Sequence, residues 1–104
     1  DLVFDVRFMP NPYYIQELRE KTGLDREVSD YVFSFQQTHD YMAKLRDLLA
    51  FTLPLYAEEG KTELVIAVGC TGGHHRSVAV THALAGDIRD LGYRVRENHR
   101  DMNR

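Results

Sequence analysis

The feature that most constrains this chain is a glycine-rich segment set between a strand pattern and a helix pattern. The apolar run from Leu64 to Val68 has the length and composition of a buried strand. A helical pattern begins near Ser77, and three glycines lie between the two. Glycine lets the backbone turn sharply and come close to a ligand. The order of strand, tight loop and helix is typical of an α/β fold that binds its ligand at the loop.

The chemistry of this segment predicts an anion site. The first N–H groups of a helix have no intrahelical partner, and the helix dipole adds partial positive charge at that end. Phosphate is a natural ligand for such a position. Arg76 adds a bidentate guanidinium, and Thr71 and Ser77 add hydroxyl donors. His75 can donate to a phosphate or a sugar hydroxyl, whereas His74 is expected to point to solvent.

The same segment fits a cysteine-phosphatase pattern, in which Cys70 is followed by five residues and then by Arg76. The cysteine would act as a thiolate nucleophile, and the arginine would hold the phosphoryl oxygens. Gly69 stands where those phosphatases usually carry a histidine. The acid that protonates the leaving group would be Asp5 or Asp25. No metal site is predicted, because Cys70 and the loop histidines lack a further cysteine or spaced acidic ligand.

The rest of the chain predicts a single small α/β domain, with a partly parallel sheet and flanking helices, over residues 1–104. A strand–loop–helix–strand order favours parallel pairing, which brings the end of the first strand, around Arg7 to Asn11, beside the loop. Asn11 is expected to cap a helix that starts at Pro12 and stops at Gly23. The expected strands are 2–8, 63–69 and 93–99, and the expected helices are 12–22, 26–33, 38–56 and 77–91.

Two helices carry a predicted inward face. In helix 77–91 the inward residues are Val80, Leu84, Ile88 and Leu91. Helix 38–56 is expected to kink near Pro54. Its leading stripe is Tyr41, Leu45, Leu48, Thr52 and Leu55, widened by Met42, Leu49, Leu53 and Tyr56.

Composition limits the class of protein. With 104 residues and 43% hydrophobic residues, the chain can form one moderate core. No apolar stretch approaches the roughly 20 residues needed to cross a bilayer, and a single cysteine fits a reducing cytoplasm. The net charge of −3 argues against a strongly basic nucleic-acid binder. Positive charge gathers late in the sequence, since residues 61–104 carry 7 Lys/Arg against 5 Asp/Glu. The abrupt start at Asp1 suggests a domain of a longer protein.

Three motifs together resemble the RapZ/YvcJ family. The first is the loop from Gly69 to Ser77, with His74 as its variable position. The second runs from Phe4 to Pro12, and the third is Thr22-Gly23-Leu24-Asp25. The ending at His99-Arg100 is similar as well. The motifs occur in the family's order and span almost the whole chain, so the resemblance is to the family's C-terminal domain.

The resemblance implies a fold similar to a subdomain of phosphofructokinase and no catalytic role for this domain. It implies that the family's N-terminal half, absent here, carries a nucleotide-binding P-loop domain. Members are bacterial cytoplasmic proteins that assemble as oligomers. The enterobacterial ones bring a small RNA to an endoribonuclease, and their C-terminal domain binds RNA and senses glucosamine-6-phosphate. No cofactor is implied.

The role of Asp5 has two alternatives. Its carboxylate either binds the amine of the sugar or forms a structural ion pair with Arg7 or Arg76. Enterobacterial relatives have a lysine in the loop and a more basic tail than this chain. An oligomerisation module with a vestigial site is a third hypothesis, beside the sensor and the phosphatase.

Carried onto this sequence, the resemblance gives two sets of residues. The expected ligand-binding residues are Asp5, Arg7, Asn11, Cys70, Thr71, Gly72, Gly73, His74, His75, Arg76 and Ser77. The expected RNA-binding residues are Arg94, Arg96, His99, Arg100 and Arg104.

Overall fold

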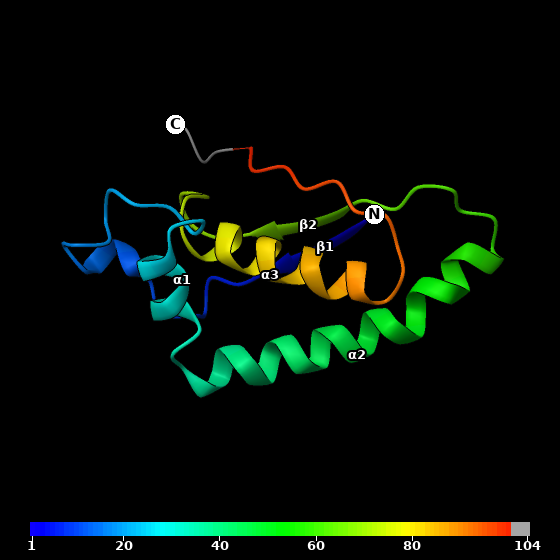
Figure 1. Cartoon of the computed structure of the whole chain (residues 1–104), viewed down its shortest axis with the longest axis horizontal. Coiled ribbons are helices and arrows are strands. Elements are labelled where there is room, and N and C mark those ends of the chain that lie inside the picture. Colours follow the sequence, from blue (N-terminus) through cyan, green and yellow to red (C-terminus); the bar gives the residue numbers. More distant parts are fainter. Residues whose placement is uncertain (101–104) are drawn as a thin grey trace.

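Two short parallel strands form the sheet of this fold, and a helical crossover joins them (Figure 1). The computed structural model describes residues 1–100. Strand β1 (Leu2–Asp5) pairs with strand β2 (Ile66–Gly69), in a register that runs from Leu2 opposite Ile66 to Asp5 opposite Gly69. The parallel sheet and the α/β class predicted from the sequence are confirmed. Both strands end at the same edge of the sheet, so the segments that follow them lie side by side.

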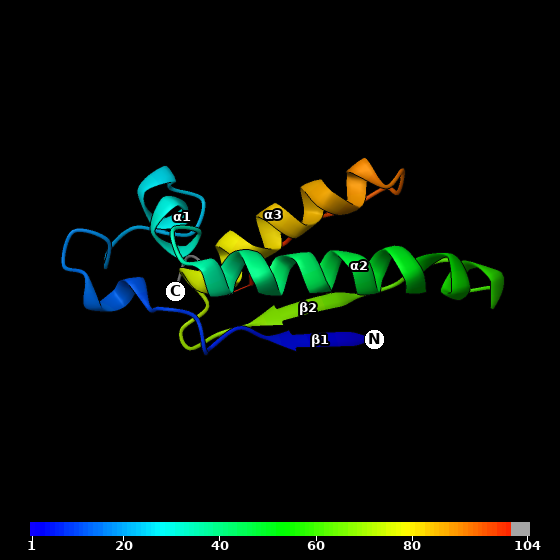
Figure 2. The ribbon, with the colours of Figure 1, turned by 90° about the horizontal axis from the view of Figure 1, so that it is seen from below.

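Within residues 1–100, three α-helices accompany the sheet: α1 (Arg26–Val32), α2 (Gln36–Glu58) and α3 (Arg76–Asp90). Figure 2 shows α2 extending along the length of the molecule beside the strands, with α3 next to it. The core lies between the sheet and these two helices. Residues alternate along β1, so that Leu2 and Phe4 pack against the core while Val3 is 77% exposed. The opposite face of the sheet is therefore open.

The long helix begins and ends two residues outside its predicted bounds and continues through Pro54 to Glu58. Its predicted inward face is wrong in part, because Leu48 and Leu55 are about half exposed, whereas Leu45 and the widening residues Met42, Leu49 and Leu53 are buried as predicted. The buried positions are spaced three or four residues apart, so they still follow one helical face. That face is Thr38, Met42, Leu45, Leu49 and Leu53.

Helices α1 and α3 agree with the prediction, since they occupy almost the expected residues. In α3, Val80, Leu84 and Ile88 are buried as expected. Leu91 lies at the C-cap and is 45% exposed, so its predicted inward position is wrong. No helix in residues 1–100 is both long and apolar enough to cross a bilayer.

The helix predicted over 12–22 is wrong beyond its first turn. Asn11 does cap a helical segment with Pro12 at its first position, but that segment is a single 3-10 turn, η1 (Pro12–Tyr14). The chain then continues in turns in which N–H groups donate to carbonyls three residues back, as Leu18 does to Ile15. In the predicted range 12–22 the buried apolar residues are Pro12 and Leu18, whose spacing of six residues places them on different sides of a helix, so a helix here would have no apolar face to pack.

The third strand predicted over 93–99 is also wrong. This segment is extended but pairs with no strand in the described chain. It runs back beside α3, as the orange and red trace in Figure 1 shows. The Arg89 guanidinium donates to the Val95 carbonyl at 3.2 Å, and Val95 packs against the core. The segment is therefore held by a helix rather than by a sheet.

Candidate functional site

A six-residue loop, 70–75, joins β2 to α3 at the carboxyl end of the sheet. Its turn depends on Gly72 and Gly73, whose φ angles are +86° and +71°. L-residues with a Cβ avoid this left-handed region, so glycine is needed at both positions. The chain can thereby reverse from the strand into the helix and leave its backbone uncovered by side chains. Thr71 and Gly72 are exposed.

The backbone N–H groups of this loop are unpaired. Within residues 1–100, none of the N–H groups from Thr71 to Arg76 donates to a protein acceptor. Unpaired N–H groups at the start of a helix carry partial positive charge. Successive N–H groups of this kind, next to residues with positive φ, form the concave sites that bind anions. The loop therefore has the donors that an anion needs.

Cys70 lies at the start of this loop and contacts the helix that follows it. Its Sγ atom accepts a hydrogen bond from the Ser77 N–H at 3.3 Å, and its side chain is half-buried. Ser77 itself is 7% exposed. The thiol is thus held against the first turn of α3.

Arg76 is buried rather than open to solvent, with 4% of its surface exposed. Its Nη1 donates to the carbonyl oxygens of Arg7 and Met9, the latter at 3.0 Å. Its Nε is buried and has no hydrogen-bond partner in the described chain. The guanidinium therefore ties the segment after β1 to the start of α3, and it brings a buried positive charge to the loop.

The two loop histidines have different surroundings. His75 is 5% exposed, and its Nε2 donates to the Arg19 carbonyl at 3.1 Å, which fixes the proton on that nitrogen. His74 is only partly exposed, so its predicted orientation toward solvent is wrong in part. Its Nε2 is buried and has no hydrogen-bond partner in residues 1–100. A buried, unpaired polar atom is costly unless a ligand or water satisfies it.

A second segment packs on the start of α3. The Gly23 N–H donates to the His74 carbonyl at 2.8 Å. A Cβ on Gly23 would lie 2.3 Å from the Ala79 nitrogen and 2.4 Å from the His75 oxygen. Asp25 holds the turn, because its carboxylate accepts from the Thr22 N–H at 2.8 Å. This contact explains why the motif from Thr22 to Asp25 accompanies the loop.

The end of β1 contributes charged side chains to the same edge. Asp5 accepts hydrogen bonds from the backbone and the side chain of Arg7, at 2.9 and 2.8 Å. These contacts with Arg7, aided by the positive charge of Arg76, hold the pKa of Asp5 below its ordinary value. A hollow of about 300 Å³ lies here, lined by Val3, Phe4, Asp5, Arg7, Gly69 and Cys70.

The predicted ligand residues are thus only partly gathered. Asp5, Arg7 and Cys70 share the hollow, and the rest of the loop, residues 71–75, follows Cys70 in the chain. Asn11 does not line this hollow, because its side chain accepts from the Tyr13 N–H at 3.0 Å and caps η1. Sequence reasoning missed the role of the Arg7 and Met9 carbonyls and of Arg19, since a backbone acceptor has no signature in the sequence.

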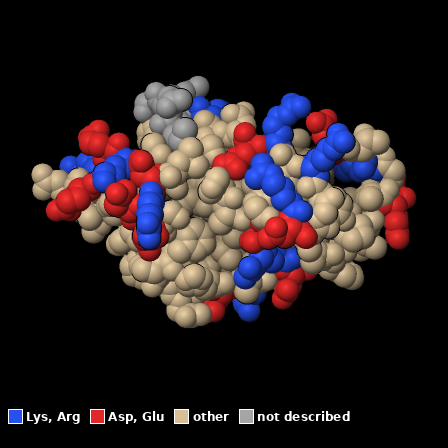
Figure 3. All heavy atoms as spheres, viewed as in Figure 1, with Lys and Arg blue, Asp and Glu red and all other residues tan. Residues whose placement is uncertain are grey.

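The predicted RNA-binding residues are dispersed along the extended C-terminal segment. Arg94, Arg96 and Arg100 are exposed, whereas the His99 side chain is 10% exposed and bonds to Glu97. Arg104 lies outside the described residues. On the face in Figure 3, lysine and arginine side chains are interleaved with acidic ones.

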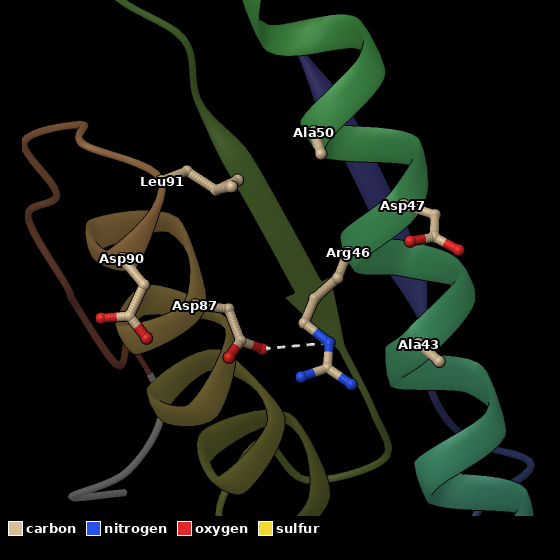
Figure 4. A pocket seen from close by; sticks show the side chains of 7 residues that line it. All are labelled: Ala43, Arg46, Asp47, Ala50, Asp87, Asp90 and Leu91. Carbon is tan, nitrogen blue, oxygen red and sulfur yellow. Dashed lines mark ion pairs between the residues drawn. The ribbon is translucent and has the colours of Figure 1, made fainter.

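A larger hollow, of about 370 Å³, lies away from the loop between α2 and α3. In Figure 4, Arg46 of α2 reaches toward Asp87 of α3, and their charged atoms are 3.8 Å apart. Ala43 and Ala50 leave room beside this ion pair.

Residues 1–100 contain no group of three side chains arranged to hold a metal ion.

The fold is a small α/β domain with a glycine-rich loop, rich in unpaired N–H groups, at the carboxyl end of a parallel sheet. The chain matches the model of the RapZ C-terminal domain over residues 1–103, and it belongs to that family. Its relatives include nucleotide-binding proteins of Clostridioides difficile (strain 630), 57% identical over 101 residues, and of Clostridium novyi (strain NT), 52% identical over 103 residues. These matches cover 97% and 99% of this chain, and 35% of either relative's length.

Proposed function

We propose that this domain is a binding and sensing module whose loop holds the phosphate of a small phosphorylated metabolite. The observation that carries the proposal is the run of six unpaired N–H groups from Thr71 to Arg76 at the start of α3. A phosphate presents several strong acceptors, and it would satisfy donors that residues 1–100 leave free. The buried, unpaired Nε of Arg76 adds a further donor close to the loop, and the unpaired Nε2 of His74 adds one in the tautomer that carries its proton.

An amino-sugar phosphate, with glucosamine-6-phosphate as the first candidate, suits the charges at the end of β1. A protonated amine needs an anionic partner, and among the described residues Asp5 is the one carboxylate that lines the hollow beside Cys70. In the structure this carboxylate is already paired with Arg7. Asp5 and Arg7 are both more than half exposed, so their pairing is weak, and an ammonium group can replace the guanidinium.

Binding of the metabolite would change how the domain interacts with larger partners, which include RNA, an endoribonuclease and other copies of the chain. The nucleotide-binding relatives are almost three times as long as this chain, and a protein of that length would have further surface for such partners. The exposed Arg94 and Arg96 are the candidates for phosphate contacts with RNA.

A cysteine-dependent phosphatase is the second candidate, because the Cys70 thiol lies against the start of α3 and accepts the Ser77 N–H. A helix N-terminus favours the thiolate. Two contacts weigh against this candidate. Arg76 directs its Nη1 to backbone carbonyls, and Asp5, which lines the same hollow as the thiol, is engaged by Arg7. Binding therefore explains the geometry better than catalysis does.

The test is a calorimetric titration with glucosamine-6-phosphate, with glucosamine, glucose-6-phosphate and inorganic phosphate for comparison. Arg76→Ala is unsuitable, because Arg76 also holds the backbone after β1. Thr71→Glu places a carboxylate beside the free N–H groups at an exposed position, and Thr62→Glu makes the same change at an exposed position before β2.

We expect binding that requires the phosphate, is weakened about a hundredfold or more by Thr71→Glu, and is unchanged in Thr62→Glu. Asp5→Asn should remove the preference for glucosamine-6-phosphate over glucose-6-phosphate. Equal binding to Thr71→Glu, or no binding of any phosphate, would contradict the proposal. Release of phosphate from an aryl phosphate, lost in Cys70→Ser, would instead establish the phosphatase.

A further inference from the structure

The chain after α3 returns beside that helix as an extended C-terminal strap, residues 93–100 (Figure 1). No strand within residues 1–100 pairs with the strap, so a backbone ladder does not hold it. Its first half is held because Val95 packs against the core and the Arg89 guanidinium donates to the Val95 carbonyl. Its second half is held by side chains whose charge changes with pH.

Three titratable side chains meet where the second half of the strap lies on α3. The Glu97 carboxylate is 3.0 Å from Nδ1 of His82, which belongs to α3, and 2.6 Å from Nε2 of His99, which belongs to the strap. The side chains of Glu97 and His99 are 15% and 10% exposed, whereas that of His82 is 63% exposed. The bond between Glu97 and His82 therefore joins the strap to the helix, and His99 supports the same carboxylate from within the strap.

The charge of Glu97 is maintained by its two neighbours. Burial acts to raise the pKa of Glu97, but the hydrogen bonds and charges of His82 and His99 hold that pKa below its ordinary value. Within residues 1–100, these two histidines are the titratable groups that face Glu97 from α3 and from the strap. Every other charged side chain of α3 and the strap is an arginine or an aspartate. Arginine and aspartate are charged on both sides of neutral pH, so they add no pH dependence there.

We propose that His82, Glu97 and His99 form a pH-sensitive latch, which holds the C-terminal strap on α3 at mildly acidic pH and loosens it as the pH rises. Histidine changes its charge between about pH 5 and pH 8. While a ring is protonated, its hydrogen bond to the carboxylate is charge-assisted and roughly twice as strong as a neutral one. When the ring loses its proton, the hydrogen bond remains but the ionic attraction is lost. The latch is therefore strongest below about pH 6 and weakens toward about pH 8.

The latch should act on the strap and leave the rest of the fold unchanged. Loss of two charge-assisted bonds, one of them screened by solvent, should raise the released fraction of the strap about five- to tenfold. The strap carries the exposed Arg94 and Arg96, so the latch decides whether these guanidinium groups are held at fixed positions. This inference does not depend on the ligand or on the proposed function, because no residue of the loop belongs to the latch.

The test is limited proteolysis of the full chain with trypsin at about pH 6 and about pH 8, the range in which histidine loses its charge. Mass spectrometry measures cleavage after Arg94 and Arg96 in the strap. Each rate is divided by the rate for a free peptide of residues 91–100 at the same pH, which removes the pH dependence of trypsin itself. This relative rate follows the released fraction of the strap. We expect it to rise about five- to tenfold between the two pH values.

Three variants assign the effect to the latch. Glu97→Gln keeps a side chain that can hydrogen-bond and removes its charge, so the relative rate should be high at both pH values. His82→Arg places a permanent charge at an exposed position and should keep the rate low at both. His39→Gln removes an exposed histidine near the start of α2, outside the latch, and should behave like the original chain. Cleavage after Arg46, inside α2, requires that helix to unfold and should not rise.

Equal relative rates at the two pH values in the original chain would overturn the proposal. So would a rise that persists in Glu97→Gln, because the carboxylate is then not the partner of the titrating group. An equal rise in cleavage after Arg46 would overturn it as well, since the whole fold is then loosened. Circular dichroism shows whether each variant is folded. If Glu97→Gln does not fold, His82→Arg decides the matter, because a rate that still rises with pH in this variant excludes the latch.

Discussion

Gly23 shows how one missing methyl group positions the candidate site. Its backbone donates to His74, and a Cβ would lie 2.3 to 2.4 Å from backbone atoms at the start of α3. Gly23→Ala should therefore destabilise the fold by about 2–3 kcal/mol, since backbone atoms cannot move aside as a side chain can. Urea unfolding followed by circular dichroism measures this change.

Gly86 provides the matched control, because it lies inside α3 and a Cβ added there would have no atom within 4 Å. Gly86→Ala should stabilise the fold by about 0.5–1 kcal/mol, as alanine favours a helix over glycine. Equal free energies of unfolding for the two variants would show that the close approach of Gly23 to α3 is not a constraint in solution.

The residues of the candidate site were predicted from the sequence more fully than their contacts. Glycines and an arginine before a helix predict an anion loop, because the physics of a helix N-terminus is local. The loop's glycines have the positive φ angles that such a turn needs. The sequence could not indicate that Arg76 is buried against two backbone carbonyls. Those carbonyls belong to Met9 and Arg7, which precede Arg76 by 67 and 69 positions in the chain.

At the scale of elements, the extended segment after α3 depends on Glu97. Its carboxylate bonds to His82 of α3 at 3.0 Å and to His99 at 2.6 Å, and its side chain is 15% exposed. Burial acts to raise the pKa of Glu97, but the hydrogen bonds and charges of the two histidines outweigh it and hold that pKa below the ordinary value of 4.5. The folded state therefore favours the charged carboxylate.

Removing this charge should lower the free energy of unfolding by an amount that depends on pH. Because the pKa of Glu97 is lower in the folded state, its stabilisation is present above about pH 4.5 and is lost as the pH falls through the folded value. Glu97→Gln should thus cost about 1 kcal/mol near pH 6 and nothing well below pH 4. Urea unfolding across this pH range measures the difference, and a cost that does not change with pH would contradict the assignment.

The same segment shows why the pairing of a strand is harder to predict than which of its side chains face the protein. Its inward residues, Val95, Glu97 and His99, do alternate with exposed ones, as a strand pattern requires. Alternation indicates which side chains face the protein, but it does not say which backbone the segment pairs with. Here the neighbour is α3, so no ladder forms. The error at Leu48 and Leu55 on α2 has a related cause. This helix has apolar residues on two faces, and the sequence does not show which of the two packs against the rest of the protein.

At the scale of the whole molecule, the candidate site joins parts of the chain that are far apart in sequence. The end of β1, the turn at Gly23 and the loop before α3 meet there, and Arg76 and Gly23 hold them together. The proposed ligand at the loop would therefore bind only when all three segments are in place. Ligand binding should consequently be linked to global unfolding rather than to the order of a single loop.

This linkage predicts a measurable rise in the melting temperature. With ligand at ten times its Kd, the folded state gains about 1.4 kcal/mol, which corresponds to about 5–10 °C for a domain of this size. Thermal unfolding with glucosamine-6-phosphate measures the shift, and potassium chloride at the same ionic strength is the control. The shift should be absent in Thr71→Glu and present in Thr62→Glu. An equal shift with the chloride salt alone would mean that charge screening stabilises the fold, because a specific phosphate site responds to phosphate and not to ionic strength.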